Sequence, residues 1–138
     1  MNLDKKDLDI LKNISEEKFL VLFPNCKLLS ITNFISEYYL KAKIFFMNFE
    51  SNVTFYFKNN ILIQIVITPL NIVSETYDIN LKKSFNIYQK AINKIFGFSI
   101  IGLFTKDRKW LYKNVIIEHY IFERFYFEER IEIEFKSK

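Results

Sequence analysis

The segment from Asn52 to Thr68 restricts the possible folds of this chain more than any other stretch. Two runs of aromatic and β-branched residues flank Asn59-Asn60, and asparagine is one of the few residues besides glycine that accepts a positive φ, so the pattern predicts a tight hairpin. The second arm is apolar at nearly every position, which is typical of a strand inside a sheet. The sequence therefore predicts an antiparallel sheet that contains this hairpin.

Helices are expected on both sides of the hairpin. Residues 4–12 are expected to form one short helix, and a second short helix is expected to follow Ser15, which can cap it. The clearest helix spans about 80–96, where apolar residues recur with helical spacing and Gly97 follows as a left-handed C-terminal residue. A helix with one such apolar stripe is expected to cover one face of the sheet. The stripe consists of Leu81, Phe85, Tyr88, Ile92 and Ile95.

Further strands are expected elsewhere in the chain. One strand, residues 37–49, leads into the hairpin, and residues 27–34 are a weaker candidate. A second hairpin is expected to turn at Lys113-Asn114, and residues 130–136 alternate between apolar and charged side chains. Together these elements predict a single α+β domain, residues 1–138. Its core would be a twisted antiparallel sheet of about five to seven strands, with one main packed helix (about 80–96) and short N-terminal helices.

Charge and cysteine content narrow the class of protein. The net charge is +4, but the lysines and arginines are scattered among acidic residues, so an anionic partner such as nucleic acid is not favoured. The single cysteine, Cys26, excludes an intramolecular disulfide. No stretch reaches the roughly 18 consecutive apolar residues of a membrane span, and no secretory signal is evident, so we expect a soluble cytoplasmic protein. The wealth of Phe, Ile, Lys, Asn and Tyr is typical of an AT-rich genome.

The ionisable residues do not form a recognisable catalytic or metal-binding pattern. The only histidine, His119, lies in the middle of a predicted strand, where a core or cross-strand hydrogen-bonding role is expected. Glu132 and Glu134 share one strand face, but Arg130 and Lys136 lie on that face too, which is typical of a solvated edge. We therefore expect no enzyme activity, no catalytic residue, no metal site and no cofactor.

Aromatic and charged residues near predicted strand ends and bends suggest a surface that binds another protein. Tyrosine, tryptophan and arginine dominate the energetics of protein interfaces, and a cluster of glutamates near the C-terminus could add a locally acidic patch. The predicted partner-binding residues are Tyr38, Tyr39, Arg108, Trp110, Arg124, Tyr126, Glu128, Glu129, Arg130, Glu132 and Glu134. The alternative is that several of these rings close the ends of the sheet.

The order of elements resembles that of small bacterial immunity proteins, which neutralise polymorphic or contact-dependent toxins. The likeness covers roughly residues 50–136 and consists of Phe-Lys-Asn-Asn-Ile-Leu-x-x-Ile (57–65), the helix ending at Gly97, Trp-Leu-Tyr-Lys-Asn-Val-Ile-Ile-Glu-His-Tyr (110–120) and a closing Ile-Glu-Ile-Glu-Phe strand. This resemblance implies an intracellular protein that blocks a toxin without catalysis. Inhibitors of nuclease toxins are often acidic whereas this chain is basic. We therefore expect either a toxin with a neutral or acidic contact surface, or a locally acidic patch on this chain around Glu128, Glu129, Glu132 and Glu134.

Two alternative functions remain open from the sequence. The first is a nucleic-acid-binding module that uses the basic helix face between residues 82 and 94, which carries Lys82, Lys83, Lys90 and Lys94. The second is a phage-type inhibitor of a host defence complex, which would share the protein-binding chemistry of the main hypothesis.

Overall fold

A computed structural model of the chain describes residues 1–70, 73–74, 79–101, 107–123 and 127–136. The helices are α1 (Lys5–Leu11), α2 (Glu16–Leu22) and α3 (Ile79–Phe96). The strands are β1 (Lys27–Thr32), β2 (Ile35–Lys43), β3 (Glu50–Lys58), β4 (Ile61–Pro69), β5 (Val73–Ser74), β6 (Ile100–Ile101), β7 (Arg108–Tyr112), β8 (Val115–Glu123) and β9 (Phe127–Phe135).

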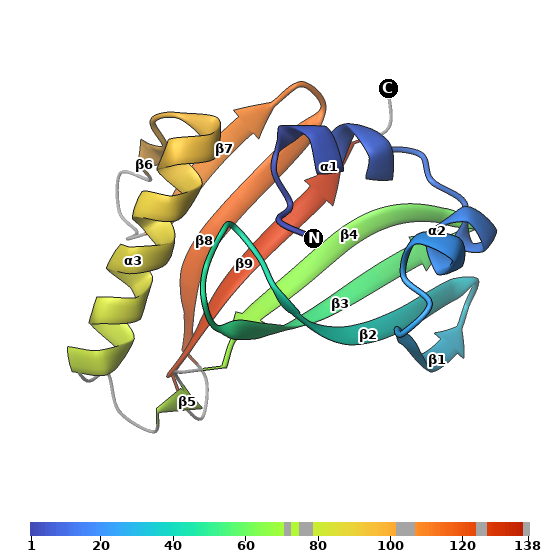
Figure 1. Ribbon diagram of the computed structural model, residues 1–138, viewed down its shortest axis with the longest axis horizontal. Coiled ribbons are helices and arrows are strands. Elements are labelled where there is room, and N and C mark those ends of the chain that lie inside the picture. Colours follow the sequence, from blue (N-terminus) through green and yellow to red (C-terminus); the bar gives the residue numbers. More distant parts are fainter. Residues whose placement is uncertain (71–72, 75–78, 102–106, 124–126, 137–138) are drawn as a thin grey trace.

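The strands in the described residues form one antiparallel sheet with the order β1-β2-β3-β4-β9-β8-β7-β6, and β5 pairs with β9. Two four-stranded meanders, β1–β4 and β6–β9, meet where β4 pairs with β9 (Figure 1). Because β5 and β6 have only two residues each, the sheet consists in substance of seven longer strands. The predicted α+β fold with a twisted antiparallel sheet and one main helix is therefore confirmed.

The helices all pack on one face of the sheet, which we call the covered face. Phe19 of α2 contacts the rings of Phe55 and Phe57 on β3, and Tyr88 of α3 approaches Ser51 at the start of that strand. The core on this face joins residues from both meanders and from α1. On the other face, here the open face, no helix of the described residues packs, and its side chains are only partly buried.

Local sequence signals explain where the helices begin and where the chain turns. The Asp4 side chain accepts a hydrogen bond from the Asp7 amide, and Ser15 caps α2 through the amide of Lys18. Gly97, which follows α3, has a φ of 88°, as its predicted left-handed role requires. Asn59 and Asn60 both have positive φ, so the predicted hairpin turn is confirmed.

The expected strand over residues 37–49 is wrong at its C-terminal end. Strand β2 stops at Lys43, and Phe45 and Phe46 then adopt positive φ. The Phe45 amide donates a hydrogen bond to the Asn2 carbonyl over 2.7 Å, and its ring is buried. The chain leaves the sheet here because the N-terminal segment offers Phe45 both a backbone acceptor and a core position, a contact that local periodicity does not reveal.

No helix in the described part of the chain is both long enough and apolar enough to cross a lipid bilayer.

Candidate protein-binding surfaces

The open face brings together part of the predicted partner-binding set. Strand alternation places Tyr39 on the open face of β2, and on β9 it places the residues with even numbers there. A shallow polar hollow of about 500 Å³ lies in this face, over β3, β4 and β9. The predicted residues on this face are Tyr39, Glu128, Arg130, Glu132 and Glu134.

Polar groups on the open face largely bond to one another. Arg130 Nε donates to Glu128 Oε2 over 3.2 Å, and its guanidinium lies 3.9 Å from the centre of the Phe122 ring. Tyr120 donates to Glu132 over 2.8 Å; burial, together with this bond, raises the pKa of Tyr120 to about 12. These groups already have partners within the sheet. The open face therefore matches the solvated strand face expected for Glu132 and Glu134 better than a strong binding site.

Three of the predicted binding residues lie in the core and are therefore not part of a binding surface. Trp110 is 1% exposed and donates through its indole nitrogen to Asn93 of α3 over 3.0 Å; Tyr38 is 7% exposed and donates to Glu16 of α2 over 2.8 Å. Glu129 is fully buried. In each case strand alternation turns the side chain toward the helices, so no partner can contact it without opening the fold.

Two of the predicted binding residues, Arg108 and Arg130, do not lie on one surface. Arg108 pairs with His119 across β7 and β8, which places it on the covered side, whereas Arg130 points to the open face. The sheet therefore separates the two arginines. Two further predicted binding residues, Arg124 and Tyr126, lie outside the described residues.

A buried polar network connects the sheet to α3. Glu129 Oε2 lies 2.6 Å from His119 Nε2, and Ser84 of α3 donates to Glu129 Oε1 over 2.5 Å. The His119 ring stacks on Phe85 with centroids 3.9 Å apart, and its Nδ1 has no hydrogen-bond partner among the described residues. Burial lowers the pKa of His119, although the bond to Glu129 acts in the opposite direction. The expected core and cross-strand role of His119 is confirmed.

This network does not have the geometry of nucleophilic catalysis. In a nucleophile–base pair the hydroxyl bonds to the imidazole, but here the carboxylate stands between Ser84 and His119. All three side chains are buried, so a substrate has no access to them. Among the residues that the structure describes, no group of three or more His, Cys, Asp or Glu side chains is arranged as metal ligands.

Sequence reasoning missed eight exposed apolar side chains on α1, α2, β1 and the turn after β1, which we call the apolar corner. Phe34 is 80% exposed, Val21 77% and Ile31 64%. Residues 27–34 are only a weak strand candidate in the sequence. Their position at the edge of the sheet depends on the order of strands, which local patterns do not reveal. The corner consists of Ile10, Leu20, Val21, Leu22, Leu28, Leu29, Ile31 and Phe34.

Comparisons with protein-family models, with curated proteins and with solved structures find no match to this chain.

Proposed function

We propose that this chain is a non-enzymatic protein that binds another protein and blocks its action, and that the partner is a bacterial toxin, as the resemblance to immunity proteins implies. The observation that carries the proposal is the apolar corner. Single exposed apolar residues are ordinary on protein surfaces, but contiguous exposed patches mark sites of interaction. Here exposed apolar residues lie on consecutive elements, α1, α2, β1 and the turn that follows β1, and three of them, Ile10, Val21 and Leu22, line one hollow.

Phe34 strengthens this argument because its conformation is costly. It has a φ of 67°, in the left-handed region that disfavours a bulky side chain, and its ring is 80% exposed, so little packing repays the cost. Strain of this kind concentrates at functional positions. An exposed aromatic ring held at a hairpin tip has the properties of an anchor for a partner pocket.

Calorimetry with the product of a neighbouring toxin gene tests the proposal. We expect the purified proteins to bind, and we expect the double change Leu29→Ser and Ile31→Ser to weaken binding by at least about tenfold, because apolar area at the corner no longer leaves water. Leu111→Ser is the matched control, since Leu111 is 63% exposed at the other end of the sheet. Absence of binding by the wild-type chain, or equal affinity of the double variant, would contradict the proposal.

A second candidate function, nucleic-acid binding, has one specific observation in its favour. Helix α3 contains four lysines and no acidic residue, and all four are exposed on its outer side. Phosphate contacts would make binding steeply dependent on salt. A gel-shift assay on single- and double-stranded nucleic acid at low and high salt tests it, and binding should be lost when these residues are changed to Glu: Lys82, Lys83, Lys90 and Lys94.

A further inference from the structure

A groove between α1 and α2 forms part of the apolar corner. It has two lobes, of about 440 Å³ and about 210 Å³, and Ile10 and Leu22 line both of them. The larger lobe also has Ile14 and Val21 among its lining residues. Its apolar walls and size suit one or two large aliphatic or aromatic side chains.

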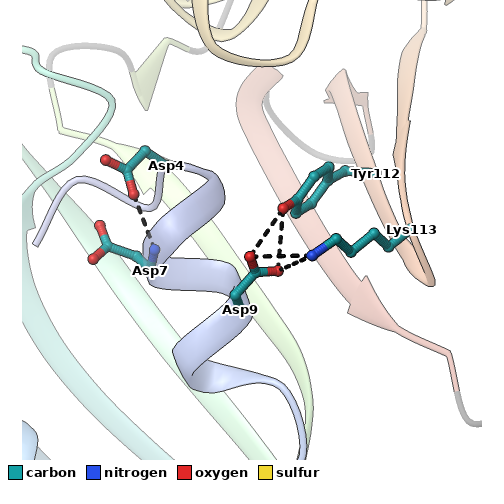
Figure 2. A network of polar contacts seen from close by, with 5 residues as sticks. All are labelled: Asp4, Asp7, Asp9, Tyr112 and Lys113. Atoms are coloured by element: carbon teal, nitrogen blue, oxygen red, sulfur yellow. Dashed lines mark hydrogen bonds and ion pairs between the residues drawn. The ribbon is translucent and has the colours of Figure 1, made fainter.

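The fold itself keeps the groove walls in place. Leu8 and Leu11 anchor α1 in the core, and Asp9 accepts hydrogen bonds from Lys113 Nζ (3.0 Å) and the Tyr112 hydroxyl (3.0 Å) at the β7–β8 turn (Figure 2). The bond from Lys113 lowers the pKa of Asp9, so this carboxylate stays charged to a lower pH than an ordinary aspartate. With these positions occupied, Ile10 is left 51% exposed on the outer side of α1.

The second wall, α2, is fixed in the same manner. Phe19 is fully buried and packs against rings of β3, with centroid distances of 4.7 Å to Phe55 and 4.9 Å to Phe57. Val21 and Leu22 consequently remain at the surface. Because both helices are held by core contacts, the groove exists before any partner arrives. Less conformational entropy is therefore lost on binding.

The charged residues that line the larger lobe are two lysines, whereas the smaller lobe has a carboxylate, Asp7, in its lining. The two lysines are Lys12 and Lys18, and neither forms an ion pair among the described residues. The only other polar residue in the lining of the larger lobe is Asn13, which is neutral. An apolar floor flanked by two unpaired ammonium groups is complementary to an apolar side chain flanked by carboxylates.

We infer that this groove holds an acidic, amphipathic segment of the partner protein, with an apolar side chain in the larger lobe and carboxylates paired to Lys12 and Lys18. The inference rests on the proposed protein-binding function and adds the chemical class of the contact. A second copy of this basic chain is the less suitable occupant, because two molecules that each carry a net charge of +4 repel one another.

Selection of a random displayed peptide library on the full chain tests the inference. We expect the enriched peptides to combine an apolar anchor with flanking Asp or Glu, and to bind less tightly as salt rises. Val21→Ser should weaken the best peptide by about tenfold, and so should Lys12→Glu combined with Lys18→Glu. The matched control is Lys41→Glu combined with Lys109→Glu, which makes the same change in net charge on exposed positions of β2 and β7, strands that contribute no residue to the groove lining.

Several results would overturn the inference. These are failure to enrich any peptide, enrichment of basic or uncharged peptides, and peptide binding that the groove variants leave unchanged. Concentration-dependent dimerisation abolished by Val21→Ser would assign the groove to a second copy instead. The proposed function can survive each of these results, because it would still be supported if toxin binding depended on Leu29 and Ile31.

Discussion

The two halves of the molecule share the same order of elements but differ in the chemistry of their cores. In each, a helix precedes a four-stranded meander: α2 with β1–β4, and α3 with β6–β9. The first half has a core of aromatic rings, in which Phe19 contacts rings of β2 and β3, and it exposes the apolar corner. The second half encloses Ser84, His119 and Glu129 in its core.

This difference shows that an aromatic core and a core with a buried polar network depend on different interactions for their stability. An aromatic core gains stability from burial and ring contacts, whichever residues the surface of its half carries. A polar core depends on every member keeping its partner, because an isolated buried charge or donor is expensive. We therefore expect stability to be most sensitive in the second half and partner binding to be most sensitive in the first.

The largest effect is expected from Glu129→Ala. This change leaves two neutral groups, His119 and Ser84, without their shared acceptor inside the core, and each unsatisfied buried group typically costs about 1–3 kcal/mol. Glu129→Gln, which retains an acceptor oxygen, should cost less. The measurement is the free energy of unfolding in urea.

Glu134→Ala is the control for Glu129→Ala, because Glu134 lies on the same strand but on the open face. Its side chain is half exposed and pairs only with the similarly exposed Lys136. Surface pairs of this kind contribute about 0–1 kcal/mol. If both variants lost the same stability, the buried network would not be a weak point of the second half.

A pH dependence that arises in the second half is expected next. Because the pKa of His119 is lowered in the fold, the unfolded chain takes up a proton near pH 6.5 while the native protein does not. The free energy of unfolding should therefore be highest above pH 6.5 and fall as the pH decreases, by at most about 1.4 kcal/mol per pH unit for one proton.

Thermal unfolding between pH 7.5 and 5.5 measures this effect, and His119→Gln should flatten the profile because the chain has no other histidine. Stability that rises as the pH decreases through this range would show that His119 carries a charge inside the fold.

The change Phe34→Gly in the first half is expected to have a smaller effect on stability, and it should raise the free energy of unfolding instead of lowering it. Glycine accepts the positive φ at the second position of the Asn33-Phe34 turn, so relief of strain should stabilise the fold by about 0.5–1 kcal/mol. The same variant should bind the partner less tightly. Phe34→Ala separates the two effects, since it removes the ring but keeps a strained backbone, and thermal melts beside calorimetry would reveal the distinction.

The smallest effect is expected from Lys18→Glu, which lies in the first turn of α2. Ser15 already accepts the Lys18 amide, and a glutamate there would complete a capping box and favour the helix dipole. We expect a gain of a few tenths of a kcal/mol, roughly 0.3–0.5, in the free energy of unfolding. A loss of stability would show that the Lys18 side chain has a structural role in the first half.

Local patterns in the sequence determined the secondary structure of this protein. The Asn59-Asn60 turn, the apolar stripe of α3 with Gly97 after it, and the inward Ile131 and Ile133 all depend on residues close together in the chain. Continuing that alternation back from Ile131 would also have placed Glu129 inward, so its burial was within reach of the sequence.

Only the tertiary structure decided which side chains are hidden and which are displayed. Trp110 became a core residue because α3 packs over β7 and supplies Asn93 as a partner. Ile31, an apolar residue of β1, lies at the surface because β1 is the last strand of the sheet and no element of the described residues covers it. Burial at an edge depends on contacts between distant segments, and local periodicity contains no information about them.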